Sequence, residues 1–179
     1  MVYALPQEGQ IVAGKGSISP PRPQNMIIQQ NSEKMITDWR SFSIGAPESV
    51  TINQPSLSSV ILNRVIGVDP SKILGKLSAN GQVFISNPAG IIFGNGAQVN
   101  VGALMATTLG ISNENFLKGN YNFVQDPTKS FSEIINKQST FFQSNFQRGV
   151  NLLAKIDILN KNSGTHSIGG FFPHAINID

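Results

Sequence analysis

The chain has 179 residues and a formal net charge of +3, with 40% hydrophobic and only 13% charged residues. This length is typical of one domain that buries its own core, and the low charge argues against a disordered chain. The 18 asparagines, 17 glycines and 10 prolines favour turns, and their density argues against a helical bundle.

The first four residues have two interpretations. Val2 and Ala4 occupy the positions that a signal peptidase reads, so residues 1–4 are interpreted as the remnant of a removed signal peptide. The other interpretation is an ordinary cytosolic start, because the basic and apolar regions of a signal peptide are absent. The folded domain is expected to span residues 5–179.

From residue 10 onwards the chain is predicted to form a series of short strands. Each has four to seven residues, is rich in β-branched side chains, and is bounded by Gly, Asn, Pro or Ser. The strands predicted before residue 110 are 10–13, 26–29, 34–37, 49–53, 59–65, 82–85, 90–93 and 97–101. A helical turn is predicted around residues 71–74, where Asp69 and Pro70 offer an N-terminal cap and a first-turn proline.

The pattern changes after residue 110. Residues 113–122 are polar and rich in Asn, and residues 132–136 fit either a strand or a helical turn. Residues 131–146 contain four phenylalanines with little strand alternation. Strand-like sequence returns at 150–154 and 156–160, and residues 169–174 carry two aromatic side chains without an obvious partner.

Two all-β architectures compete for these strands. An antiparallel sandwich would use tight two-residue turns, for which Asn80-Gly81 and Asn95-Gly96 qualify. A parallel β-helix stacks coils of roughly 20 residues, with aliphatic interiors and with Gly and Asn at the corners. The uncharged, Asn- and Gly-rich composition favours the β-helix. The residues expected in or beside its core are Val83, Phe84, Ile91, Ile92, Val99 and Val101.

The ionisable residues do not form a catalytic or metal-binding pattern. His166 and His174 match no zinc spacing, and cysteine is absent. β-Helical polysaccharide enzymes need grouped carboxylates, whereas the aspartates here are well separated in sequence. We therefore expect no enzyme activity, metal or cofactor. Because basic residues are scattered and no apolar run approaches about 20 residues, neither nucleic-acid binding nor membrane insertion is expected.

The segment Asn87-Pro88-Ala89-Gly90 has the pattern of a turn. Pro88 presets φ at the first central position, Gly90 tolerates positive φ, and the Asn87 side chain can bond the backbone two residues further on. The simpler interpretation is a β-turn between two strands. The functional interpretation is an exposed recognition loop.

A set of motifs follows in order along the chain. They are residues 5–7, 9–14, 38–45, 53–56, 62–65, 69–75, 80–84, 87–91, 93–94, 97–102, 106–109 and 111–115. Together they resemble the N-terminal two-partner secretion domain of the filamentous haemagglutinin family of Gram-negative exoproteins. The resemblance is good over roughly residues 5–116 and thin beyond, and so many motifs in order are far more specific than one short pattern. Ala89 and Ser86 depart from it, since the family usually has Asn and an apolar residue there.

The resemblance implies a right-handed parallel β-helix with an N-terminal cap and extra-helical β-strands. It also implies a non-enzymatic domain that targets a large exoprotein, such as an adhesin, haemolysin or contact-dependent toxin, to its outer-membrane transporter. The transporter's POTRA domains would recognise it in the periplasm, and the exoprotein would reach the cell surface or the medium of a Gram-negative bacterium. The residues expected to form the secretion signal are Asn63, Arg64, Asn80, Asn87, Pro88 and Gly90.

Two other functions stay open at this point. The domain could be a β-helical adhesin module that binds host cells or glycans directly, which an exposed aromatic patch near a polar groove would favour. A polysaccharide-acting enzyme would instead be favoured by carboxylates grouped on one face. In the secretion-domain interpretation, the host cell surface is a partner only through the passenger that follows this domain.

Overall fold

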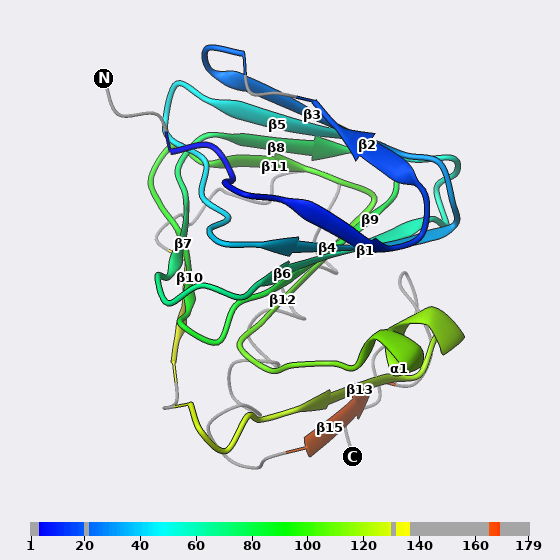
Figure 1. Ribbon diagram of the computed structural model, residues 1–179. Coiled ribbons are helices and arrows are strands. Elements are labelled where there is room, and N and C mark those ends of the chain that lie inside the picture. Colours follow the sequence, from blue (N-terminus) through cyan, green and yellow to red (C-terminus); the bar gives the residue numbers. More distant parts are fainter. Residues whose placement is uncertain (1–3, 20–21, 130–131, 137–164, 169–179) are drawn as a thin grey trace.

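The computed structural model describes residues 4–19, 22–129, 132–136 and 165–168. These residues form a β-solenoid of about three turns with very little helix (Figure 1). The elements are β1 (Gln10–Ala13), β2 (Gly16–Ile18), β3 (Asn25–Gln30), β4 (Lys34–Trp39), β5 (Ser49–Asn53), β6 (Val60–Val65), β7 (Ser71–Ile73), β8 (Lys76–Ala79), β9 (Gln82–Ser86), β10 (Ile91–Phe93), β11 (Gln98–Asn100), β12 (Ala103–Thr107), α1 (Asn113–Lys118), β13 (Tyr121–Val124), β14 (Ile134–Asn136) and β15 (Thr165–Ile168).

Three sheets surround the solenoid interior. The first sheet has the order β1-β4-β6-β9-β12, the second β11-β8-β5-β3-β2 and the third β14-β10-β7. A turn of the chain visits the second, first and third sheets in succession, as β5, β6 and β7 do before β8, β9 and β10. Successive turns pair in parallel, so that Leu62 of β6 lies opposite Phe84 of β9. The predicted right-handed parallel β-helix with an N-terminal cap and extra-helical strands is confirmed.

Alternate residues of the strands fill the interior, because successive side chains of a strand point to opposite faces. Five of the expected core residues are buried, namely Val83, Phe84, Ile91, Val99 and Val101, and Ile92 is half-buried. Phe84 differs from the other buried residues in its surroundings, because it belongs to a second hydrophobic cluster.

This second cluster covers the outer face of the first sheet. The ring of Phe84 makes edge-to-face contacts with Phe116 of α1 and Tyr121 of β13, at centroid distances of 5.8 and 5.1 Å. The helix α1 begins after the capping residue Ser112 and ends at Gly119, whose φ of 78° is left-handed. The first sheet is therefore buried on both faces, which explains why β9 is buried at every position.

Residues 4–18 form the N-terminal cap over the first turn. In this cap β1 pairs antiparallel with β4, and β2 pairs antiparallel with β3 (Figure 1). Trp39 and Phe42 fill the end of the interior, with ring centroids 5.5 Å apart. A side chain at Gly9 would overlap the Trp39 ring, so glycine is needed where the chain passes directly over the indole.

The predicted helical turn at residues 71–74 is wrong, because Ser71–Ile73 is strand β7. β7 pairs in parallel with β10 and buries Ser71 and Ile73, and this pairing outweighs a local helix signal that is too short to be stable alone. The Asn-rich segment after residue 112 contains α1, which was not predicted. The ambiguous segment at 132–136 contains strand β14. The features predicted at 137–160 and 169–174 lie outside the described residues.

Candidate functional site

Asn63, the first residue of the expected secretion signal, points into the solenoid interior and is fully buried. Its Oδ1 accepts hydrogen bonds from the Thr37 hydroxyl at 3.0 Å and from the Trp39 indole N–H at 3.1 Å. Its Nδ2 donates to the Phe84 carbonyl oxygen at 3.4 Å. These bonds satisfy a polar group that the core would otherwise leave unpaired, so Asn63 joins consecutive turns from the inside.

Arg64 is the next residue of β6 and therefore points to the outer face. Its guanidinium donates to both carboxylate oxygens of Asp38, at 2.7 and 3.0 Å, and to the Asn113 side-chain oxygen at 2.8 Å. The side chains of Arg64 and Asp38 are 22% and 19% exposed. The bidentate ion pair with Asp38 holds the guanidinium in place. Because Asn113 begins α1, the bond from Arg64 to Asn113 then fixes the helix against the first sheet. Most of the Arg64 donors are thus engaged within the chain.

Asn80 lies at the corner between β8 and β9. Its Oδ1 accepts the Gln54 backbone N–H at 2.7 Å, and its Nδ2 donates to the Gln54 carbonyl oxygen at 2.8 Å. The buried side chain of Gln54 in turn accepts from the Gly81 N–H at 2.9 Å and donates to Gln30 Oε1 at 3.0 Å. This ladder of amides sets the spacing of neighbouring turns. Gln54 and Gln30 could not be recognised from the sequence, because a glutamine whose amide is buried in such a ladder has the same local pattern as one that is exposed at the surface.

Asn87 lies in the turn between β9 and β10, and its side chain is fully buried under that turn. Its Nδ2 donates to the Asp69 carbonyl oxygen at 3.0 Å and to Ser71 Oγ at 2.9 Å, while its Oδ1 accepts the Ala89 N–H at 2.9 Å. The Gly90 N–H donates to the Asn87 carbonyl oxygen at 3.0 Å, which closes a β-turn. Gly90 has a φ of 109°, a conformation that other residues rarely adopt.

An exposed apolar surface adjoins this turn. The loop between β6 and β7 exposes 66% of Ile66 and 82% of Val68, and the bond from Asn87 to Asp69 joins this loop to the half-buried Pro88 and Ala89. We call Ile66, Val68, Pro88 and Ala89 the corner patch. Sequence reasoning placed only Pro88 of this patch in the site, since an exposed Ile or Val cannot be told from a buried one by local pattern.

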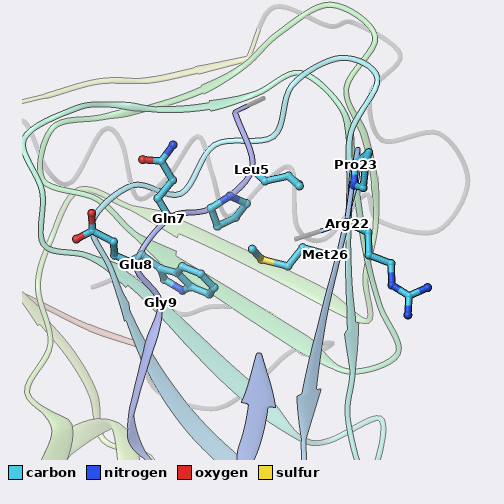
Figure 2. Close-up of a pocket in the computed structure, with 9 residues that line it drawn as sticks. Leu5, Gln7, Glu8, Gly9, Arg22, Pro23 and Met26 are labelled. Carbon is cyan, nitrogen blue, oxygen red and sulfur yellow. The ribbon is translucent and has the colours of Figure 1, made fainter. Parts of the chain in front are cut away.

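A pocket of about 610 Å³ lies between the N-terminal cap and the loop before β3 (Figure 2). Leu5, Pro6, Pro23, Met26 and Trp39 make its wall largely apolar, and Gln7, Glu8, Gly9 and Arg22 complete the lining. Glu8 has a φ of 51° and so adopts a left-handed conformation at the edge of this pocket. Sequence reasoning missed this pocket, because its walls come from segments that only the cap brings together.

The described residues contain no group of three or more His, Cys, Asp or Glu side chains able to hold a metal ion. Burial raises the pKa of Tyr121, and hydrogen bonds from Thr128 lower the pKa of Asp126. The hydrogen bond to Glu8 and the charge of Glu8 raise the pKa of Arg40. In the same part of the chain, no helix is long and apolar enough to cross a bilayer. Of the two histidines, His174 lies outside the described residues, and only the backbone of His166, in β15, is described.

Comparison with known proteins identifies this architecture. The family profile of the TPS secretion domain matches residues 5–166. This chain belongs to the TPS secretion domain family. The crystal structure of the HMW1 secretion domain from Haemophilus influenzae is similar, with 35% sequence identity and a TM-score of 0.70. The match covers 73% of this chain and 35% of the HMW1 chain. The filamentous hemagglutinin secretion domain matches 75% of this chain and 49% of its own, with 18% identity and a TM-score of 0.53, and it shares the fold.

Two sequences from Haemophilus influenzae, both called heme/hemopexin-binding protein, are also similar. One is 40% identical over 121 residues and the other 43% identical over 104 residues, which are 68% and 58% of this chain. The matched segments are 13% and 11% of the relatives. This TPS domain chain therefore spans roughly an eighth of the length of these relatives.

The two departures from the family pattern have structural explanations. Ser86 is buried, and its hydroxyl donates to the Leu109 carbonyl oxygen at 2.7 Å, so a polar side chain is satisfied where an apolar one is usual. At position 89 the backbone N–H, not the side chain, bonds to Asn87. Ala89 can therefore occupy this position of the TPS domain without breaking the turn.

Proposed function

We propose that this TPS domain targets a longer exoprotein to its cognate outer-membrane transporter, whose periplasmic POTRA domains recognise it. The match to the TPS secretion domain over residues 5–166 carries the proposal, because the members of this family are non-enzymatic modules of secreted exoproteins. The exoprotein passes through the periplasm and ends at the cell surface or in the medium of a Gram-negative bacterium. Its passenger carries any adhesive, haemolytic or toxic activity and any contact with host cells.

The corner patch is the surface that we assign to this recognition. Large aliphatic side chains exposed at 66% and 82% gain from being covered by a partner, and Ile66 and Val68 are only two residues apart in the loop between β6 and β7. The turn beside them is held by the internal bonds of Asn87, so a partner binds it without a large ordering cost.

The expected signal residues then divide into two groups. Pro88 belongs to the contact surface itself. The others are engaged within the fold: Asn87 and Gly90 shape the turn that carries Pro88. The remaining three make their contacts away from the corner patch, namely Asn63, Arg64 and Asn80.

Export of a reporter passenger through the cognate transporter tests the proposal. The double variant Ile66→Ser/Val68→Ser is expected to lower export at least about ten-fold, with a melting temperature within about 2 °C of the unaltered domain because both side chains are exposed. Leu57→Ser is the control, because Leu57 is 77% exposed at a different corner. Unchanged export by the double variant would remove the corner patch from the proposal, and unchanged export after deletion of the whole domain would refute transporter targeting.

Direct binding of glycans or host cells gains no support from the described part of the chain. Its exposed large hydrophobic side chains are all aliphatic: Val12, Ile27, Leu57, Ile66, Val68, Leu117 and Val124. An aromatic platform for a sugar ring is not among them.

A further inference from the structure

Two Asn-Gly pairs form corners of the solenoid, and neither joins the strands of an antiparallel hairpin. Asn80-Gly81 lies between β8 and β9, and Asn95-Gly96 lies between β10 and β11. An Asn-Gly pair can react with itself, because glycine has no side chain to hinder the attack of its nitrogen on the amide carbon of the preceding asparagine. The reaction requires that the amide and the glycine nitrogen are free and that the main chain between them can rotate.

The pair Asn80-Gly81 is held in place by Gln54. The amide of Asn80 exchanges two hydrogen bonds with the Gln54 backbone, at 2.7 and 2.8 Å, and the Gly81 N–H donates to Gln54 Oε1 at 2.9 Å. Gly81 is also buried, and a Cβ built on it would lie 2.7 Å from Gln54 Oε1 and 2.8 Å from the Ser59 carbonyl oxygen. Both groups that would react are therefore engaged, and three hydrogen bonds have to break before they can meet.

The pair Asn95-Gly96 lacks these restraints. Among the described residues, the Asn95 side chain and the Gly96 N–H have no hydrogen-bond partner. Both residues are exposed, Gly96 has a φ of 84°, and a Cβ built on Gly96 would meet no atom within 4 Å. One hydrogen bond closes this corner, from the Ala97 N–H to the Gly94 carbonyl oxygen at 3.2 Å. The main chain can therefore rotate here by breaking a single long hydrogen bond.

We propose that Asn95 is a site of non-enzymatic deamidation in the folded domain. The Gly96 nitrogen loses its proton to solvent and attacks Cγ of Asn95. A bond forms between this nitrogen and Cγ, the bond from Cγ to Nδ2 breaks, and Nδ2 takes up a proton and leaves as ammonia. The product is a five-membered succinimide ring. Water then adds to either of the two ring carbonyl carbons and breaks its bond to the Gly96 nitrogen, which leaves aspartate or isoaspartate at this position.

The modification changes both the charge and the main chain of this corner. A carboxylate replaces a neutral amide, so the formal net charge of +3 falls by one. Isoaspartate also routes the main chain through the side-chain carbon, which lengthens the corner between β10 and β11. This corner lies at the opposite end of β10 from the turn of the corner patch. The inference is therefore independent of transporter targeting, and either can fail without the other.

Incubation of the full chain of 179 residues in neutral buffer tests the proposal, with Asn80 as the internal reference. Mass spectrometry of peptides from one sample measures how much of each asparagine has been converted, and chromatography separates isoaspartate from aspartate. We expect Asn95 to convert at least about ten-fold faster than Asn80, because conversion of Asn80 has to break three hydrogen bonds instead of one. Isoaspartate is expected beside aspartate. Equal rates at the two sites, or aspartate alone at position 95, would overturn the proposal.

The same incubation in urea separates the effect of the fold from that of the neighbouring sequence. Unfolding frees both Asn-Gly pairs, so the two rates are expected to come within about three-fold of each other. A ten-fold preference for Asn95 that persists in urea would show that the fold does not cause it, and would overturn the structural assignment. Asn95→Gln is the control variant, because its longer side chain would have to close a six-membered ring. Deamidation of this variant at the rate of the unaltered chain would contradict the succinimide route.

Discussion

Replacing Asn87 by Ala removes the amide that holds the corner between β9 and β10. The variant loses two donated bonds, to the Asp69 carbonyl and Ser71 Oγ, and one accepted bond, from the Ala89 N–H. Ser71 is 1% exposed, so its hydroxyl stays buried and loses a partner, which costs about 1–3 kcal/mol. With about 0.5–1.5 kcal/mol for each remaining bond, partly regained from water, we expect a loss of about 2–4 kcal/mol.

Thermal unfolding of the purified domain, followed by circular dichroism, measures this loss. For a chain of this size the expected fall in melting temperature is roughly 5–15 °C. Asn95→Ala is the matched control, because Asn95 is exposed at the next corner and its replacement is expected to change stability by less than about 0.5 kcal/mol.

Export of a passenger separates a scaffold role of Asn87 from direct recognition. If Asn87 builds the turn, export of Asn87→Ala falls only at temperatures where the variant unfolds. Export lost at every temperature, with a melting temperature within about 2 °C of the unaltered domain, would refute the scaffold reasoning. Asn87 would then itself contact the transporter.

Three further predictions concern the core, the ion pair and the pH dependence. Val83→Ala is expected to cost about 2–5 kcal/mol in urea unfolding, because Val83 is fully buried in the interior, and a cost below about 1 kcal/mol would contradict the assigned packing. Arg64→Ala leaves Asp38 partly buried without its partner, so we expect the free energy of unfolding to fall by about 1–3 kcal/mol and the amides of α1 to exchange faster. Unchanged exchange in α1 would show that the ion pair does not hold the helix on the sheet. Burial raises the pKa of Tyr121 above its unfolded value near 10, so the stabilisation by the neutral phenol is fully present below that pH and is lost as the pH rises through the pKa of the folded state. Tyr121→Phe should therefore flatten the fall of stability at alkaline pH. The same dependence of stability on pH in Tyr121→Phe and in the unaltered domain would contradict this prediction.

Local sequence was sufficient for most strands and corners. Runs such as Val60–Val65 and Gln82–Ser86 are rich in β-branched or aromatic side chains and end at turn formers, so pairing with neighbours only reinforces what each segment already favours. The turn at Asn87 was also predictable, since its proline and glycine fit one backbone conformation. The resemblance to the secretion-domain family added the right-handed parallel β-helix with its N-terminal cap and extra-helical strands.

Tertiary structure alone decided which role each polar residue has. Asn63 and Arg64 are neighbours in one strand that is buried on both faces, so alternation sends them to opposite sides without indicating which side is the interior. The helix signal before Ser71 was local, and the strand formed because β10 offered a full ladder of backbone hydrogen bonds. Glu48 likewise reads as an ordinary surface carboxylate, and it is buried because the N-terminal segment, 44 residues earlier, folds back over it.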